Sequence, residues 1–183
     1  EGQSVAIRSP HDSLSLGIGM IHQHFKLVDV LSVQENIVLG TPPKKGGAQQ
    51  IERDIRAISE RFSLSVDPAR KVYSLSVGEK QTVEILKVLH RGSRILILDE
   101  PTAVLTPQEI DKLFVILRRM REEGCAVIII THKLSEVLQI SDRVTILRKG
   151  RSVATVNTRE TNAKQLTELM VGHSVDLSIE RPA

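Results

Sequence analysis

The sequence has 183 residues, of which 40% are hydrophobic and 26% charged, proportions typical of a folded globular protein rather than a disordered chain. The net charge is only +3 and aromatic residues are 2%, so neither a basic nucleic-acid-binding surface nor a base-stacking platform is indicated. No apolar run approaches the roughly 18 residues of a membrane-spanning helix, and the single cysteine, Cys125, excludes an internal disulfide.

The first 40 residues predict short elements separated by turns. Residues 3–8 are expected to form a strand that Ser9 and Pro10 end, and residues 11–18 a short helix. Residues 18–22 read as a second strand. Residues 32–40 begin with the Ser-x-x-Glu pattern of a capping box, which predicts a short helix.

The next part of the chain predicts a loop and two helices. Residues 41–50 are rich in Pro, Gly and Lys, as in exposed loops, and apolar side chains recur at helical spacing in residues 51–62. Ser76 and Glu79 form a second capping box, with Gly78 between them. A helix start with a serine hydroxyl and a bare glycine backbone suits a phosphate group. The alternative is an ordinary capped helix without a ligand.

A β-α-β unit is predicted near the middle of the chain. Residues 95–98 and 126–130 are wholly apolar, as in strands inside a parallel sheet. The helix between them begins at the capping box of Thr106 and ends at Gly124, and the crossover is expected to be right-handed. The elements expected after it are a helix at residues 134–140, strands at 143–148 and 151–156, and a helix at about 162–171.

Four polar residues follow predicted strands, where ligands of parallel sheets bind. Asp99 can hold Mg²⁺, and Glu100 beside it can orient a water for attack on a phosphate; the alternative for this pair is a solvated turn. His132, after the second apolar strand, can contact a phosphate or position a water, or serve only a structural role. Gln23 offers an amide that can coordinate a metal or sense a ligand, a weak signal alone.

Together these features resemble the ATP-binding cassette (ABC) ATPases over nearly the whole chain. The matching segments are Ile21-His22-Gln23 for the Q-loop, Leu75–Glu79 for the signature motif LSGGQ, Ile95–Pro101 for Walker B with the catalytic glutamate, Ala103–Thr106 for the D-loop and His132 for the switch histidine. The spelling is similar to the first of two tandem cassettes in bacterial importers of nucleosides and simple sugars.

The resemblance implies an α/β fold: a partial P-loop NTPase core of the ABC type, with a parallel sheet plus a helical subdomain. It also implies a division into four segments. These are an N-terminal β remnant with the Q-loop (1–26), the helical subdomain ending in the signature helix (27–91), the remaining ATPase core (92–172) and a tail or linker (173–183).

The resemblance further implies ATP and Mg²⁺ as ligands and hydrolysis by the intact protein. The implied roles are Glu100 and His132 in catalysis, Asp99 and Gln23 on the metal, and Ser76, Val77, Gly78 and Glu79 on the ATP of a partner cassette. The implied partners are transmembrane permease subunits and a second cassette bound head to tail, with no nucleic acid. The implied location is the cytoplasmic face of the cell membrane.

The sequence departs from the family pattern in several places. It contains no Gly-x-x-x-x-Gly-Lys-[Ser/Thr], the phosphate-binding P-loop. Because only 22 residues precede Gln23 and the chain does not begin with Met, we expect an N-terminally truncated piece of a longer protein that cannot hydrolyse ATP alone. Open strand edges are expected to favour self-association. Val77 and Glu79 replace a glycine and a glutamine of the signature, and Thr106 replaces an acidic residue.

Two other functions remain open. The first is an ABC ATPase without a membrane partner, although the basic arms or long coiled-coil insertions typical of such proteins are not visible. The second is a non-catalytic module that completes the ATP site of a partner through Ser76–Glu79.

Overall fold

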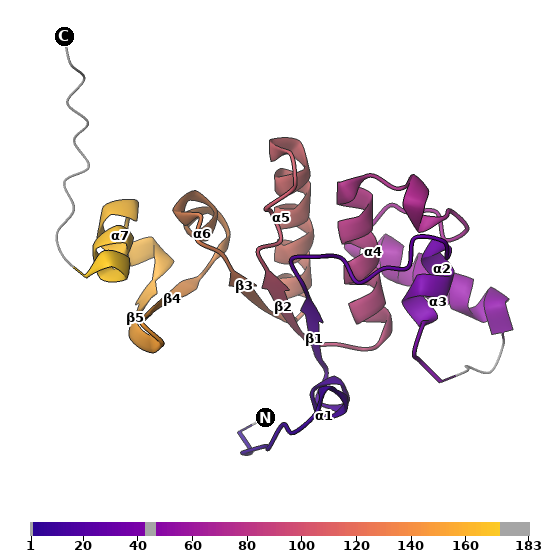
Figure 1. The fold of residues 1–183 in the computed structure, drawn as a ribbon, viewed down its shortest axis with the longest axis horizontal. Coiled ribbons are helices and arrows are strands. Elements are labelled where there is room, and N and C mark those ends of the chain that lie inside the picture. Colours follow the sequence, from indigo (N-terminus) through magenta and orange to yellow (C-terminus); the bar gives the residue numbers. More distant parts are fainter. Residues whose placement is uncertain (1, 43–46, 173–183) are drawn as a thin grey trace, which may run out of the picture. The chain divides into compact units, whose positions relative to one another are not determined.

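The computed structural model describes residues 2–42 and 47–172, and the chain divides into two compact units, Glu1–Ile130 and Thr131–Ala183 (Figure 1). We call them the first and the second unit. Among the helices described, none is both long and apolar enough to cross a bilayer. The predicted division into four segments stays a prediction, and its tail at residues 173–183 lies outside the described residues.

A parallel sheet of three strands lies in the first unit: β1 (Ile18–Ile21), β2 (Ile95–Asp99) and β3 (Ala126–Ile130). The order is β1-β2-β3, so β2 is the middle strand (Figure 1). Leu96 and Leu98 of β2 are buried. Ile128 and Ile130 of β3 are about half exposed, so the expectation of an interior strand holds for β2 and is wrong for β3 in the described structure.

The crossover between β2 and β3 is α5 (Pro107–Glu122). Its capping box at Thr106 is confirmed: the Glu109 N–H bonds the Thr106 hydroxyl, and the Glu109 carboxylate accepts from the Thr106 N–H. Pro107 occupies the first helical position, where no intrahelical bond to its nitrogen is needed. The buried face of α5 consists of Leu113, Phe114, Leu117 and Met120.

Helices fill the rest of the first unit. They are α1 (Pro10–Ser15), α2 (Val33–Val38), α3 (Gly47–Phe62), the short 3-10 helix η1 (Val72–Ser74) and α4 (Val77–His90). Helix α4 packs against both α2 and α3, and its buried apolar side chains are Val83, Ile85, Leu86 and Val88. The predicted capping boxes at Ser32 and Ser76 both start helices, which confirms these two positions.

The second unit contains α6 (Leu134–Ile140), β4 (Arg143–Arg148), β5 (Arg151–Asn157), the 3-10 helix η2 (Thr158–Glu160) and α7 (Ala163–Val171). Strands β4 and β5 pair antiparallel, joined by Lys149 and Gly150. Both residues have positive φ angles, 48° and 73°, as a tight two-residue hairpin turn requires. Helix α7 packs on β4 and ends at Gly172, which has a left-handed conformation.

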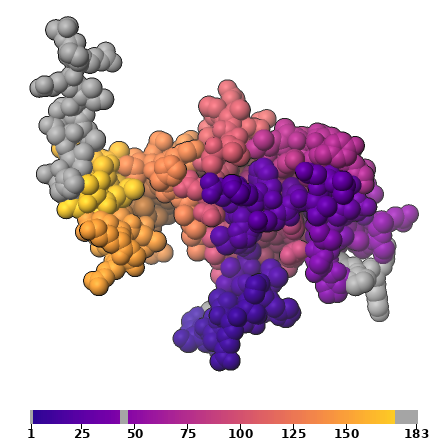
Figure 2. Space-filling model, in the orientation of Figure 1, coloured from indigo at the N-terminus to yellow at the C-terminus, as the bar shows by residue number. Residues whose placement is uncertain are grey.

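Two predictions near the N-terminal part of the chain are wrong. Residues 3–8 are not a strand: Val5 and Ile7 are more than half exposed, and the segment projects from the rest of the first unit (indigo in Figure 2). A strand needs a neighbouring ladder, and among the described residues none lies beside this segment. The second error concerns the loop at 41–50, because α3 already begins at Gly47.

Candidate functional site

Three of the predicted site residues share the carboxyl edge of the sheet. Asp99 is the last residue of β2 and Glu100 follows it, while Gln23 comes two residues after β1. In the register of β1 and β2, Ile21 pairs with Leu98, so the chain leaves both strands at the same level. Gln23 is exposed and Asp99 half-buried. This is the edge at which parallel α/β sheets bind ligands.

The backbone fixes Glu100 in an unusual conformation. Its φ angle is +46°, a left-handed value that non-glycine residues rarely adopt. The Glu100 N–H donates to the carbonyl of Ile130 on β3 at 2.9 Å, and the Glu100 carbonyl accepts from the Ala103 N–H at 3.2 Å. Such conformations cost free energy and concentrate at functional sites, where surrounding contacts hold them. The half-buried Glu100 side chain therefore leaves the strand in a direction set by β3 and the following turn.

The start of α4 presents Ser76 and Val77 to solvent. The Glu79 N–H donates to the Ser76 hydroxyl at 3.2 Å, and the Ser76 N–H donates to Glu79 Oε2 at 2.7 Å. This reciprocal box fixes the backbone of the helix start, so the N–H groups of the first turn point in one defined direction. Ser76 is exposed and Gly78 is half-buried, and both lie at the helix start where the sequence predicts an anion site.

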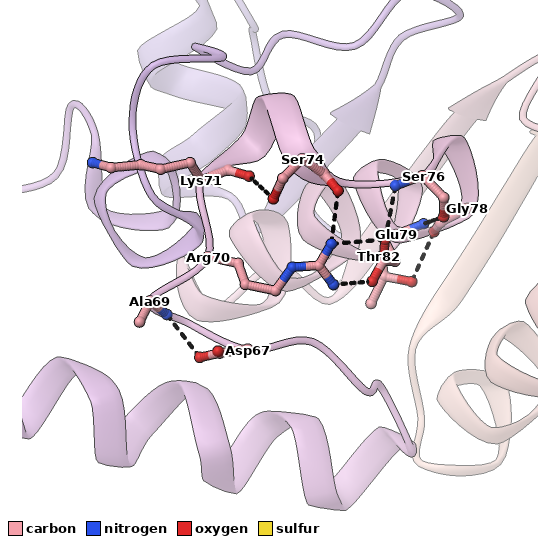
Figure 3. A network of polar contacts seen from close by, with 9 residues as sticks. All are labelled: Asp67, Ala69, Arg70, Lys71, Ser74, Ser76, Gly78, Glu79 and Thr82. Carbon is pink, nitrogen blue, oxygen red and sulfur yellow. Dashed lines mark hydrogen bonds and ion pairs between the residues drawn. The ribbon is translucent and has the colours of Figure 1, made fainter.

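An arginine that the sequence pattern does not identify holds Glu79 (Figure 3). Arg70 Nη1 lies 2.5 Å from Glu79 Oε1, and Arg70 Nη2 donates to the Ser74 carbonyl at 2.7 Å. The Ser76 N–H above all, and the Arg70 guanidinium, lower the pKa of Glu79. The carboxylate that replaces the usual signature glutamine is thus paired with a positive charge. Nothing in the local pattern identifies Arg70, because the contact joins a turn to a helix that begins seven residues later.

A second missed residue is Glu109, which meets the helix start from α5. The Glu109 carboxylate lies against the backbone of Gly78. A Cβ atom placed on Gly78 would lie 2.5 Å from Glu109 Oε1, so any larger residue would displace that side chain. The capping contacts of Thr106 and the Gly78 N–H together lower the pKa of Glu109. The glycine of the signature is therefore in direct contact with α5.

Helix α4 also holds the segment that follows Gln23. The Lys26 N–H donates to Glu84 Oε1 at 2.5 Å, and Lys87 Nζ donates to the Lys26 carbonyl at 2.8 Å. Glu84 is buried, and burial lowers the pKa of Lys87. The backbone N–H and carbonyl of Lys26 are thus both bound by the helix that begins at Ser76. A movement of either segment would therefore displace the other.

A surface cavity of about 360 Å³ lies between these segments. Lys80 Nζ contacts Asp29 Oδ1 at 3.0 Å at its wall. The other lining residues come from the Q-loop and the predicted D-loop: Gln23, His24, Phe25, Leu27 and Val104. The cavity therefore joins two of the motifs that the sequence resemblance identified, the Q-loop and the D-loop, and Lys80 at its wall directly follows a third, the signature.

The remaining predicted residue, His132, lies in the second unit. It is exposed and comes two residues before α6, beside Thr131, whose hydroxyl accepts from the Lys133 N–H at 3.1 Å. Its predicted place with Asp99 and Glu100 stays a prediction.

The donor chemistry at the sheet edge fits a magnesium ion that arrives with a phosphate. A carboxylate from Asp99 and an amide oxygen from Gln23 are hard ligands of the type Mg²⁺ prefers, and this ion usually completes its shell with water and phosphate. Within residues 2–42 and 47–172, no group of three or more His, Cys, Asp or Glu side chains is assembled for a metal.

Comparison with known families agrees with this geometry. Residues 1–103 match the family model described as "ABC transporter". The chain therefore belongs to the ABC transporter family and is part of its ATP-binding domain.

Curated relatives define the kind of subunit more closely. The chain is 47% identical to the nucleoside import ATP-binding protein NupA of Lactococcus lactis and 49% identical to the guanosine import ATP-binding protein NupO of Bacillus subtilis, in each case over its whole length. It is 43% identical over 98% of its length to the ribose import ATP-binding protein RbsA 2 of Streptomyces coelicolor. It spans 37%, 36% and 35% of these three proteins, little more than a third of each.

Solved structures confirm the fold class. The structure of cbiO1 from Clostridium perfringens, part of the ABC transporter complex cbiONQ, is 27% identical with a TM-score of 0.73, over 90% of this chain and 67% of cbiO1. MJ1267 in its ADP conformation, an ATP-binding cassette of an ABC transporter, gives a TM-score of 0.74 at 22% identity, over 91% of this chain and 72% of MJ1267. The fold is a partial ABC-type P-loop NTPase core with a parallel sheet plus helices.

Proposed function

We propose that this chain is part of the ATP-hydrolysing subunit of an importer for nucleosides or simple sugars. The observation that carries the proposal is the shared edge of β1 and β2, which assembles Gln23, Asp99 and Glu100 in the same unit as the capped signature helix. The names of the relatives, which concern import of nucleosides, guanosine and ribose, support the class of cargo.

In the proposed subunit, Asp99 and Gln23 would hold Mg²⁺ bound to ATP, and the ion would neutralise charge that develops on the phosphates. Glu100, whose backbone is held by β3 and the following turn, would orient the attacking water or accept its proton. His132 would contact the γ-phosphate. Ser76, Val77, Gly78 and Glu79 would meet the nucleotide of a second cassette, since a helix start attracts anions.

The proposed partners are a second cassette, bound head to tail, and transmembrane permease subunits at the cytoplasmic face of the membrane. Phe25 is half-buried while His24 and Lys26 on either side are exposed, and these three residues are the proposed contact surface for a permease segment. Because the backbone N–H and carbonyl of Lys26 are both bound by α4, a movement of this surface would be transmitted directly to the signature helix.

The isolated chain is proposed to be inactive. Its sequence lacks the Gly-x-x-x-x-Gly-Lys-[Ser/Thr] motif that holds the β- and γ-phosphates in P-loop NTPases. A MgATP titration by calorimetry should therefore show no binding up to millimolar nucleotide. Micromolar binding would contradict the proposal, because another element would then have to hold the phosphates.

The positive test uses an intact relative, the guanosine import ATP-binding protein of Bacillus subtilis, as partner. MgATP should promote association of the wild-type chain with this protein in analytical ultracentrifugation, because the chain supplies the signature helix. Ser76→Arg should abolish the increase in association that MgATP causes. Ser135→Arg, at an exposed serine of α6, should leave this increase unchanged. Association that is independent of MgATP, or equal in both variants, would contradict the proposed role.

A further inference from the structure

Glu109 touches two helix starts at once. Its Oε2 accepts hydrogen bonds from the N–H and the hydroxyl of Thr106, both at 2.9 Å, and so caps its own helix α5. Its other oxygen, Oε1, lies against Gly78 at the start of α4, where a Cβ atom would come within 2.5 Å of it. An anionic side chain is therefore already seated on the signature helix.

The Gly78 amide belongs to the first turn of α4, whose N–H groups have no partner within the helix. Of its neighbours, the Glu79 N–H is satisfied by the Ser76 hydroxyl. Glu79 itself is paired with Arg70 and directed at the Ser76 N–H. Of the two carboxylates at this helix start, Glu109 is thus the one that reaches it from another element, and it lies where an anion approaching Gly78 would have to come.

We propose that Glu109 is an internal competitor for the anion site of the signature helix, so that a phosphate binds Gly78 only when the Glu109 carboxylate has left it. This inference rests on the proposed function, in which Gly78 meets the phosphate of a second cassette's ATP. Two anions cannot occupy the same place against Gly78, and like charges in contact repel, so the two states are mutually exclusive.

The exchange requires little rearrangement. When Oε1 moves away from Gly78, Oε2 can keep its contacts with Thr106, so the cap of α5 survives while one carboxylate oxygen turns away. Thr106 ends the segment that resembles the D-loop, and the bond from Thr106 to Glu109 connects that segment to the signature helix. Occupation of the signature by phosphate would therefore be transmitted to Thr106 through a single side chain.

The test variant is Glu109→Gln, because glutamine still fits a capping box but carries no charge. A neutral side chain beside Gly78 opposes an incoming anion less than a carboxylate does, because the like-charge repulsion is gone. The matched control is Glu35→Gln. Glu35 occupies the same position in the capping box of α2, with its carboxylate on the Ser32 N–H at 2.5 Å, and removing its charge leaves Gly78 untouched.

The experiment is a titration of the isotope-labelled chain with inorganic phosphate at constant ionic strength, followed at the Gly78 amide by NMR. We expect Glu109→Gln to bind phosphate at least about threefold more tightly than wild type, because the competing charge is gone. Glu35→Gln should match wild type. Equal affinity in all three proteins, weaker binding in Glu109→Gln, or no phosphate-dependent shift at Gly78 in any of them would overturn the proposal.

Two further readouts separate competition from a structural role and from the proposed function. A merely structural Glu109 would change thermal stability but not the dissociation constant for phosphate. In MgATP-dependent association with the Bacillus subtilis relative, Glu109→Gln should also bind more tightly than wild type, and equal or weaker association would again overturn the proposal. If wild type and variant both fail to associate while phosphate competition persists at Gly78, the proposed function fails and the competition stands.

Discussion

Asn36 shows how much one buried polar side chain can stabilise near the Q-loop. It is fully buried, accepts from the Val28 N–H at 2.7 Å, and donates to the carbonyls of Val28 and Ser32, both at 3.0 Å. Replacement by alanine leaves the Val28 N–H without its partner, whereas the carbonyls of Val28 and Ser32 keep the N–H groups of Leu31 and Asn36. An unsatisfied buried group costs about 1–3 kcal/mol.

We therefore expect Asn36→Ala to lower the free energy of unfolding by about 1–3 kcal/mol, measured by urea denaturation. The matched control is Gln49→Ala, an exposed amide on α3, which should change stability by less than about 0.5 kcal/mol. An equally small loss of stability in both variants would show that the Val28 N–H finds another hydrogen-bond partner.

The contacts of Glu79 predict how the stability of the folded state depends on pH. Its folded pKa is lowered, first by the Ser76 N–H and then by Arg70, so the charged form is preferred in the folded state. The stabilisation is present above the ordinary glutamate pKa of about 4.3 and is lost as pH falls through the lower folded value. Wild type should be more stable than Glu79→Gln at pH 7, and this difference should shrink below about pH 4.3.

Thermal unfolding at several pH values measures this difference. Glu60→Gln, at an exposed carboxylate near the end of α3, is the control for a general effect of net charge. If the gap between wild type and Glu79→Gln stays constant down to pH 3, neither the pairing with Arg70 nor the capping contact stabilises the folded state.

At the scale of single elements, α5 depends on one buried stripe. Phe114 is 1% exposed, whereas the next residue on the same helix, Val115, is 59% exposed. Phe114→Ala should cost about 3–5 kcal/mol, because it removes a large apolar side chain and leaves a cavity. Val115→Ala should cost less than about 1 kcal/mol. Comparable losses in urea denaturation would mean that α5 is packed differently from this description.

Helix starts were the elements that the sequence predicted best. The boxes at Ser32, Ser76 and Thr106 are local: donor and acceptor are three residues apart, so the pattern alone determines the contact. The strand at residues 3–8 was predicted wrongly because a strand depends on a distant partner, and alternation of apolar residues does not reveal whether one exists.

In the candidate site, too, local patterns identified some residues and missed others. The positions of Gln23, Asp99 and Glu100 after strands followed from apolar runs, and the parallel register places them at one edge. The contacts of Arg70 with Glu79 and of Glu109 with Gly78 were missed, because each joins separate elements whose packing no local pattern specifies. These missed contacts are the ones that control charge at the signature helix.

For the whole molecule, the outer position of β3 predicts self-association. Ile128 and Ile130 are 50% and 47% exposed on a strand at one end of the described sheet. An apolar strand with unpaired N–H and carbonyl groups offers a template to another chain, and a charge on such a strand opposes pairing. We therefore expect the isolated chain to associate with itself as concentration rises.

Ile128→Lys should shift this equilibrium towards the monomer, as measured by sedimentation velocity over a concentration series. The control is Val115→Lys, which adds the same charge at a similarly exposed position on α5, away from any strand edge. If both lysines reduce association equally, net charge rather than the strand is responsible. If neither does, β3 is already covered in solution, and the apolar surface at Ile128 and Ile130 is not where copies of the chain meet.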